Sequence, residues 1–282
     1  MSESSNDPLV ERRSDSSVAN PSVVVKNVSK TYTLPSASSR KSLRRRGSKT
    51  VDALKNISFV ARQGESIGII GRNGSGKSTL LRLVGGGEAP SSGKIFVRHQ
   101  PTLLGVAPAL QSWLTGEQNI YLGCLALGMK PDEAKAAVPE IAEWAELGEA
   151  ALRPMGTYSS GMSAKLSFAI STAVKPEVLL VDETLSTGDA AFAKKAQARM
   201  NELLERAGNL FLVSHSTSMI EGTCERGIWI HQGELIEDGD CGEVIADYRA
   251  FTNLLSDGKV DEANRLMQEV RSNNHEPWIE LS

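Results

Sequence analysis

A glycine-rich stretch at residues 71–78, Gly-Arg-Asn-Gly-Ser-Gly-Lys-Ser, has the residue types and spacing of a phosphate-binding loop. Its glycines let the backbone turn tightly and bring N–H groups close to phosphate oxygens. The lysine places a positive charge on the outer phosphates, and the Ser78 hydroxyl can ligate Mg²⁺. The flanking strand-like and helix-like runs disfavour the alternative of a chance glycine-rich turn. The nucleotide-binding candidates are Gly71, Asn73, Gly74, Ser75, Gly76, Lys77, Ser78 and Thr79.

A second apolar run, Val178–Val181, ends in two carboxylates, Asp182 and Glu183. The carboxyl end of a strand is where α/β sheets bind their ligands. We therefore expect Asp182 to hold Mg²⁺ through water, and Glu183 to orient or deprotonate an attacking water molecule. A solvated strand end is the alternative interpretation, which the phosphate-binding loop upstream disfavours.

A histidine follows the next apolar run, since His215 comes directly after Leu210–Ser214. A lone histidine is more often structural than catalytic. Its place at the end of the strand beyond Asp182 favours instead a contact with the terminal phosphate of a nucleotide. In that role His215 would hold the catalytic geometry.

Hydrophobic periodicity predicts the elements that must position these residues. Short apolar runs of the kind buried on both faces alternate with helical segments, which predicts an α/β core with a parallel sheet. Strands are expected at Val23–Val28, Val51–Val60, Glu65–Ile70, Leu103–Val106, Val178–Val181 and Leu210–Val213. Helices are expected at Ser78–Val84, from Gly116 to about Ala151, at Ser163–Val174 and over Glu243–Val270. Pro131 and Pro139 are expected at helix starts, where the missing N–H costs least.

Composition narrows the class of protein. The chain has 282 residues, 40% of them apolar, and a net charge of −3, so it has no global attraction to nucleic acid. No apolar run approaches the roughly 18 residues of a membrane span, and the polar N-terminus does not resemble a secretory leader. Three separated cysteines without metal-type spacing, Cys124, Cys224 and Cys241, indicate a reduced cytosolic setting. We expect any action at a membrane to go through a partner.

The polar segments suggest the domain boundaries. Residues 1–21 are expected to form a disordered tail. Residues 36–50 form a basic insertion without an acidic residue, which can face anionic lipid headgroups or the pyrophosphate of a lipid carrier. A solvated loop is the alternative interpretation of that insertion. The expected domains are a nucleotide-binding domain at 22–250 and a short helical extension at 251–282.

In this order, the motifs resemble those of the nucleotide-binding subunits of ABC transporters. The stretch Tyr158–Met162, Tyr-Ser-Ser-Gly-Met, looks like a variant of that family's LSGGQ signature. A plain helix cap is the simpler alternative for a Ser-Ser-Gly turn. The resemblance implies an α/β P-loop NTPase core with a mixed sheet, a helical subdomain at about 107–174 that carries the signature, and an antiparallel β subdomain.

In this family the signature of one subunit closes over the nucleotide on the other. The resemblance therefore implies a head-to-tail dimer of two copies, with two ATP molecules and their Mg²⁺ in the interface. It implies nucleotide contacts for Ser159, Ser160, Gly161 and Asp189, the last in a dimer-contact loop at Leu185–Asp189. Tyr32 matches the aromatic residue that stacks on adenine, a core aromatic being the alternative.

One position departs from the family pattern. The usual glutamine ahead of the Thr115–Asn119 stretch would fall near Gly105 and Val106, and neither side chain can ligate Mg²⁺. Gln111 is nearby but out of register. The metal contact of that loop is therefore in question.

Three stretches, together with the insertion at 36–50 between the first strands, resemble a narrower group, the ATPases that export polysaccharides such as O-antigen, teichoic acid, capsule and galactan. The three stretches are the signature variant, Leu114–Leu122 and Val181–Ala190, and the resemblance covers about residues 22–250. It implies a peripheral protein at the cytoplasmic face of the membrane, a polytopic permease as partner, and a lipid-linked glycan reached through it. A galactan of actinobacterial type is the preferred cargo, and the carbohydrate-binding C-terminal domain of some members is expected to be lacking.

Other function classes stay open. A soluble ABC-type ATPase of translation or DNA repair is the first, although such proteins usually carry two cassettes or long coiled coils. An ABC ATPase for another class of substrate is the second. A regulator that binds ATP without hydrolysing it is the third, and Asp182, Glu183 and His215 speak against it.

Overall fold

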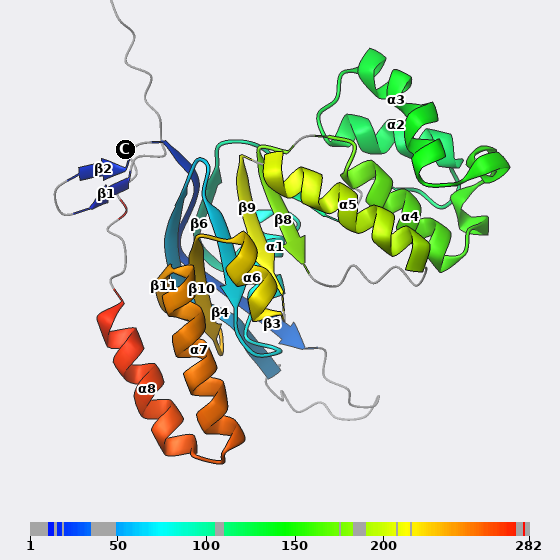
Figure 1. The fold of residues 1–282 in the computed structure, drawn as a ribbon. Coiled ribbons are helices and arrows are strands. Elements are labelled where there is room, and N and C mark those ends of the chain that lie inside the picture. Colours follow the sequence, from blue (N-terminus) through cyan, green and yellow to red (C-terminus); the bar gives the residue numbers. More distant parts are fainter. Residues whose placement is uncertain are drawn as a thin grey trace, which may run out of the picture. The chain divides into compact units, whose positions relative to one another are not determined.

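The structure is a computed structural model of the chain. It describes residues 11–13, 16–18, 20–34, 49–104, 110–174, 176–182, 190–206, 208–214, 216–274 and 279. The chain divides into two compact units (Figure 1). Unit 1 comprises Met1–Arg98 and Val213–Ser282, and unit 2 comprises His99–Leu212.

An antiparallel sheet forms one part of unit 1. Its strands are β3 (Pro21–Leu34), β4 (Lys49–Arg62) and β6 (Ser92–Val97), in the order β4-β3-β6. The run Val23–Val25 is fully buried, as suits β-branched residues on a pleated surface. β3 extends beyond the expected Val23–Val28 because its polar second half still pairs with β4, where Tyr32 lies opposite Val51. Before β3, the short strands β1 (Glu11–Arg13) and β2 (Ser16–Val18) pair antiparallel.

A second group of strands in unit 1 is mixed in direction. β5 (Ser66–Ile70) runs parallel to β10 (Arg226–His231), which pairs antiparallel with β11 (Glu234–Asp240). Four of the five residues of β5 are buried, as expected for a strand covered on both faces. The expected strand before the glycine-rich loop is confirmed.

The described residues of unit 1 form four helices. They are α1 (Lys77–Val84), α6 (Thr217–Thr223), α7 (Cys241–Ser256) and α8 (Val260–Asn273). The helical segment expected over Glu243–Val270 is thus two helices, separated at Gly258, whose φ of 76° ends a helical turn. Beyond α8, Ile279 packs with Val24 and Val60 of the antiparallel sheet. In the part of the chain that the structure describes, no helix combines the length and apolar character that crossing a membrane would require.

The strands of unit 2 are short and apolar. They are β7 (Thr102–Leu103), β8 (Val178–Asp182) and β9 (Asn209–Val213), in the order β9-β8-β7, and the last residue of β9 is already counted in unit 1. β7 runs parallel to β8. The strand expected at Leu103–Val106 begins one residue earlier, and residues 105–109 lie outside the described part.

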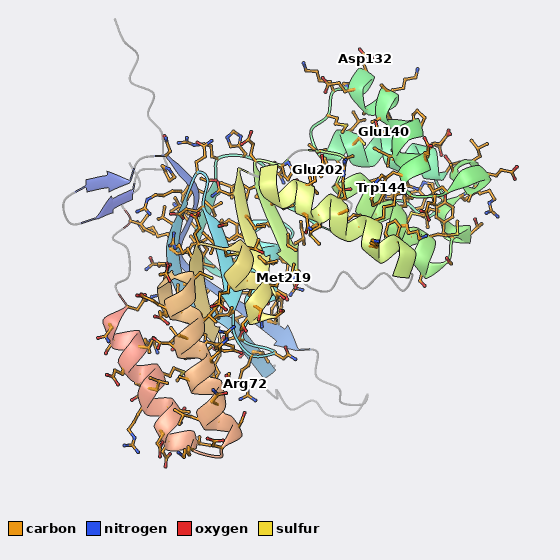
Figure 2. All side chains as sticks on the ribbon, in the orientation of Figure 1. Arg72, Asp132, Glu140, Trp144, Glu202 and Met219 are labelled. Carbon is orange, nitrogen blue, oxygen red and sulfur yellow. The ribbon has the colours of Figure 1, made fainter. Side chains whose placement is uncertain are left out.

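Helices make up most of unit 2. They are α2 (Gly116–Ala126), α3 (Pro131–Trp144), η1 (Gly148–Leu152), η2 (Met155–Thr157), α4 (Ser160–Ser171) and α5 (Ala190–Arg206). Ile120, Leu166 and Ile170 belong to a buried cluster to which α2, α3 and α4 all contribute. Trp144, labelled in Figure 2, stacks on Phe168 with ring centroids 5.6 Å apart.

Two expectations about these helices were wrong. Pro131 does lie in the first turn of α3, but Pro139 lies inside that helix rather than at a start. A proline lacks the N–H that would bond to residue 135, and because position 139 is exposed, water can satisfy that carbonyl. The helix expected at Ser163–Val174 runs instead from Ser160 to Ser171, because Ser159 caps it.

Candidate functional site

The phosphate-binding loop connects β5 to α1, and its glycines are required by the backbone. Gly71, Gly74 and Gly76 have φ values of 149°, 77° and 110°, which L side chains rarely adopt. A Cβ on Gly76 would also lie 2.5 Å from the carbonyl oxygen of Ala53 in β4, and one on Gly71 would collide with the carbonyl oxygen of Ile230 in β10. The loop therefore packs closely against β4 and β10, and leaves no room for a Cβ at Gly71 or Gly76.

The side chain of Lys77 crosses the interior of this loop and bonds to the loop's first residues. Its side chain is 6% exposed, and its Nζ donates to the carbonyl oxygens of Gly71 at 2.6 Å and Arg72 at 3.1 Å. The ammonium group thus lies at the centre of the turn, where an anion's phosphates would meet it. α1 begins at this lysine and has no acidic residue in its first turn, so its N-terminus stays attractive to negative charge.

Ser75 supplies a second indication that this loop fits a phosphate. Its hydroxyl oxygen is buried and has no hydrogen-bond partner among the described residues. A buried hydroxyl without a partner costs free energy, which a bound phosphate oxygen would recover. Amides, ammonium and hydroxyl together are the donor set that a nucleotide's phosphates need. Ser78 follows in α1, and its hydroxyl is of a type that can ligate Mg²⁺.

The turn between β10 and β11 holds the phosphate loop in place. This contact was not predicted from the sequence. The amide of Gly233 donates to the carbonyl oxygen of Ser75 at 2.9 Å. The carbonyl oxygen of Gly233 accepts from the amide of Lys55 at 2.7 Å. Gln232 and Gly233 have φ values of 49° and 83°, as in a two-residue hairpin turn. The Gln-Gly pair after the apolar stretch of β10 was the signal for a turn, but β11, with four acidic residues, does not show the alternation of a hairpin strand.

A polar pocket of about 420 Å³ adjoins the loop in unit 1. It is lined by Gly71–Ser75, by His231 and Gln232 at the end of β10, and by Tyr248 of α7. Burial, with the nearby charge of Arg72, lowers the pKa of His231. Arg72, labelled in Figure 2, therefore lines the pocket together with residues of α7 and of the β10–β11 turn.

Tyr32 lies on β3 in the same unit and is partly buried. Its hydroxyl donates to Oε2 of Glu88 at 2.7 Å. It is therefore neither a fully buried core aromatic nor a free surface ring. Glu88, which follows α1, did not stand out in the sequence.

The remaining catalytic candidates belong to unit 2 or fall outside the described residues. Asp182 ends β8 and is partly buried. Glu183, Asp189 and His215 lie outside the described part of the chain, as do Gly105 and Val106. Within the described residues, no cluster of three or more His, Cys, Asp or Glu side chains could hold a metal ion. Of the expected Mg²⁺ ligands, Ser78 belongs to unit 1 and Asp182 to unit 2.

The Ser-Ser-Gly turn forms the start of α4. Ser159 is the N-cap, and its hydroxyl accepts a hydrogen bond from the amide of Met162 at 3.2 Å. Ser160 and Gly161 are exposed in the first turn. A Cβ on Gly161 would meet no atom closer than Ser159 Oγ at 3.9 Å, so packing within the chain does not require a glycine there. The simpler interpretation, a helix cap, holds for Ser159 and leaves its two neighbours available to a ligand.

The Leu-Thr-Gly-Glu-Gln-Asn stretch shapes the loop that enters α2. Thr115 and Gln118 form a capping box. The buried Asn119 donates to the carbonyl oxygens of Gln111, Leu114 and Thr115, and its Oδ1 accepts from the amide of Gln111 at 2.7 Å. The backbone of Gln111 is thus held by Asn119.

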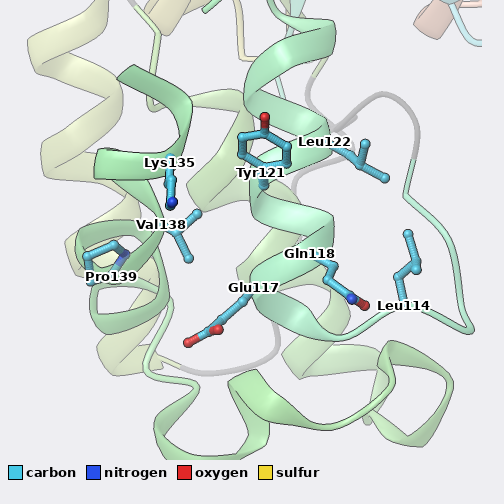
Figure 3. A pocket seen from close by; sticks show the side chains of 8 residues that line it. All are labelled: Leu114, Glu117, Gln118, Tyr121, Leu122, Lys135, Val138 and Pro139. Atoms are coloured by element: carbon cyan, nitrogen blue, oxygen red, sulfur yellow. The ribbon is translucent and has the colours of Figure 1, made fainter. Parts of the chain in front are cut away.

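A second pocket lies between α2 and α3. It has a volume of about 730 Å³ and is lined by Leu114, Glu117, Gln118, Tyr121, Leu122, Lys135, Val138 and Pro139 (Figure 3). None of these residues belongs to the phosphate loop or to the Ser-Ser-Gly turn, so this pocket is separate from the candidate nucleotide site.

Comparison with known proteins decides the family. The family model described as ABC transporter matches residues 54–186. The teichoic acids export ATP-binding protein TagH of Staphylococcus epidermidis is 42% identical over 203 residues, which are 72% of this chain and 77% of that protein. The chain belongs to the family of ABC transporter ATP-binding proteins. The TagH protein of Bacillus cereus is 40% identical over 217 residues, which are 77% of this chain.

The chain spans only 40% of the length of that Bacillus relative, and 40% of TagH of Bacillus anthracis. Solved structures show the same fold as this ABC transporter ATP-binding protein. An ATP-binding subunit of an ABC transporter has a TM-score of 0.61 at 23% identity, covering 80% of this chain and 93% of that one. A dimeric ATP-binding cassette bound to ADP and Pi has a TM-score of 0.59 at 22% identity, covering 78% of this chain and 98% of that one. The expected P-loop fold, with a mixed sheet, helices and an antiparallel β subdomain, is confirmed.

Proposed function

We propose that this chain is the ATP-hydrolysing subunit of a transporter that exports a lipid-linked polysaccharide across the cytoplasmic membrane. The observation that carries the ATPase proposal is the loop at Gly71–Ser78, with three left-handed glycines and Lys77 at its centre. The teichoic acids exported through the TagH relatives suggest the class of cargo. A lipid-linked galactan is a second cargo of the same chemical class.

The sequence motifs suggest one role for each residue. Lys77, the loop amides and Tyr32 bind the nucleotide, while Ser78 and Asp182 hold Mg²⁺, which neutralises phosphate charge when bound. Glu183 orients or deprotonates the attacking water, and His215 contacts the terminal phosphate. The nucleotide-binding site of one copy is completed by the exposed N-terminus of α4 from the other copy. The residues proposed for that second contact are Ser159, Ser160, Gly161 and Asp189.

The partners follow from this arrangement. A second copy supplies the signature residues. When the two copies close on ATP, they move the polytopic permease to which they are bound. We place the protein at the cytoplasmic face of the membrane, bound there through that permease. The basic residues at 36–50 then contact anionic headgroups or a lipid pyrophosphate, although most of them lie outside the described residues.

The deciding experiment compares Glu183→Gln with the unaltered chain. We expect the variant to bind ATP, to accumulate as a dimer in size-exclusion chromatography with light scattering, and to lose nearly all turnover. Glu140→Gln makes the same carboxylate-to-amide change on the exposed face of α3 and should behave as the unaltered protein. Turnover that survives in Glu183→Gln would remove that residue from the catalytic role.

The cargo is tested separately, with the permease. Proteoliposomes that contain both subunits should move a fluorescent lipid-linked glycan only with ATP and intact Lys77. ATP hydrolysis that proceeds without any permease-dependent stimulation by lipid-linked glycan would favour the soluble ATPase instead. A galactan carrier and a teichoic acid carrier, supplied in turn, distinguish the two cargoes.

A further inference from the structure

One carboxylate joins the expected base-binding tyrosine to the helix that follows the phosphate loop. Tyr32 Oη donates to Glu88 Oε2 at 2.7 Å, across 56 positions of sequence. The other oxygen, Oε1, lies 2.9 Å from Nε of Arg82 in α1. A single side chain thus contacts both the strand that carries the ring and the helix that begins at Lys77.

Lys30 completes this group. Its Nζ lies 3.1 Å from Glu88 Oε2 and donates to the carbonyl oxygen of Ala89 at 2.8 Å. The same Nζ lies 5.1 Å from the centroid of the Tyr32 ring, in the geometry of a cation–π contact. The cation therefore touches both the ring and the carboxylate that holds its hydroxyl.

These contacts restrict the tyrosine more than packing alone would. Hydrogen bonds to an ionised carboxylate are shorter and stronger than those between neutral groups. The hydrogen bond from Tyr32, ahead of the charges of Arg82 and Lys30, lowers the pKa of Glu88, so the acceptor stays ionised at neutral pH. The exposed fraction of the Glu88 side chain is 28%, so water competes only in part.

We propose that Glu88 is a positioning residue for nucleotide binding, which holds the Tyr32 ring in the orientation that receives the adenine base. This inference rests on the proposed role of Tyr32 in stacking. A flat ring stacks on a base only when it is presented at the correct angle, and a ring that is free to rotate must first be ordered. Through Arg82, the same carboxylate sets the ring relative to the helix of the phosphate loop.

The test separates base binding from phosphate binding. Affinities are measured by calorimetry for two probes with Mg²⁺, the non-hydrolysable analogue adenylyl imidodiphosphate and inorganic tripolyphosphate. Tyr32→Phe removes only the hydroxyl and leaves every ion pair of Glu88 in place. We expect it to weaken binding of the adenine nucleotide by about three- to tenfold, the cost of ordering one side chain, and to leave tripolyphosphate affinity unchanged.

Glu88→Gln provides an independent variant, and a double variant tests coupling. Glu88→Gln should weaken adenine nucleotide binding to the same extent, and Tyr32→Phe/Glu88→Gln should be no weaker than the weaker single variant. Glu146→Gln is the matched control, since that glutamate pairs with Lys165 and Lys195 but with no tyrosine. Its affinity for both probes should equal that of the unaltered chain.

The failures of the two proposals can be told apart. If Tyr32→Ala binds the adenine nucleotide as tightly as the unaltered chain, then the tyrosine does not stack, and the proposed nucleotide role of Tyr32 falls with the inference. If Tyr32→Ala weakens binding while Tyr32→Phe and Glu88→Gln do not, only the positioning role of Glu88 is overturned. An equal loss for tripolyphosphate would mean that Glu88 acts on the fold of the loop rather than on the ring.

Discussion

The amide of Gly233 donates a 2.9 Å hydrogen bond to the carbonyl oxygen of Ser75, so a hairpin turn late in the chain holds the phosphate loop. The carbonyl oxygen of Gly233 in turn accepts from the amide of Lys55 in β4. The loop's shape therefore depends on contacts from two other segments as well as on its own glycines.

Replacing Gly233 should distort this support. Its φ is 83°, and a Cβ would lie 2.8 Å from the carbonyl oxygen of Ala53. We expect Gly233→Ala to lower the free energy of unfolding by about 2–3 kcal/mol, since left-handed strain and backbone collision add. Urea titration measures this loss, and tripolyphosphate affinity should fall with it.

The control for this prediction is Gly64→Ala. Gly64 has a φ of 90°, but no atom lies within 4 Å of the place that a Cβ would take, so only the left-handed strain applies. That variant should lose about 1 kcal/mol and bind tripolyphosphate normally. Equal losses in the two variants would show that the contact with β4 has no energetic weight.

Asn119 should be among the most sensitive positions of unit 2. The residue is fully buried, and its amide group donates to three carbonyl oxygens and accepts from one amide. Asn119→Ala removes these four side-chain hydrogen bonds at a buried position, although each of the three carbonyl oxygens keeps a backbone amide donor. At roughly 0.5–1.5 kcal/mol for each bond, we expect a loss of about 3 kcal/mol in the free energy of unfolding. Gln118→Ala, which removes only an exposed capping contact, should lose about 1 kcal/mol. Thermal melting of both variants checks the ranking, which a larger loss in Gln118→Ala would reverse.

Glu237 should make stability depend on pH. Burial, with the charges of Asp247 and Glu243, raises the pKa of this carboxyl from 4.5 to about 7, and its Oε2 is buried without a partner among the described residues. Between those two values the folded chain holds a proton that the unfolded chain releases. The contribution of Glu237 to stability is therefore present below about pH 4.5 and is lost as pH rises through about 7.

Glu237→Gln removes that titration. We expect the variant to be more stable than the unaltered chain at pH 8, and to show a flatter stability profile between pH 5 and pH 8. Urea denaturation across this range measures both. Glu140→Gln should run parallel to the unaltered chain, and a parallel profile for Glu237→Gln as well would mean that Glu237 ionises normally.

The cysteines should react slowly in the folded protein. Cys124, Cys224 and Cys241 are buried and free. Burial raises the pKa of all three thiols, to about 11 for Cys124 and about 12 for Cys224. Because the thiolate is the reactive form, Ellman's reagent at pH 8 should modify the native chain slowly and all three thiols rapidly in urea. Rapid modification of the native chain would show that unit 1 or unit 2 opens locally.

The phosphate loop could be predicted from the sequence because its chemistry is local. Glycines, lysine and serine follow one another, and the flanking strand and helix show their own periodicity. Helix ends were less certain, since Ser159 could be either a cap or a ligand until the structure placed it before α4. Pro139 misled because a proline inside a helix looks the same in sequence as one at its start.

The supports of the site could not be predicted in the same way. Glu88 meets Tyr32, and Gly233 meets Ser75, only because β3, α1 and the β10–β11 turn come together in unit 1. Glu88 is marked by no periodicity or motif, and the Gln-Gly pair at 232–233 indicates a turn without indicating that the turn contacts the phosphate loop. Contacts between such distant positions are set by how strands pair, which single residues do not reveal.

The packing of Ile279 against Val24 and Val60 has a consequence for synthesis in the cell. A nascent chain emerges from the ribosome with its N-terminal part first. β3 and β4 are therefore made long before the residue that completes their apolar cluster. Until Ile279 emerges, Val24 and Val60 lack one of their packing partners, and this sheet stays open to a chaperone that binds apolar surface.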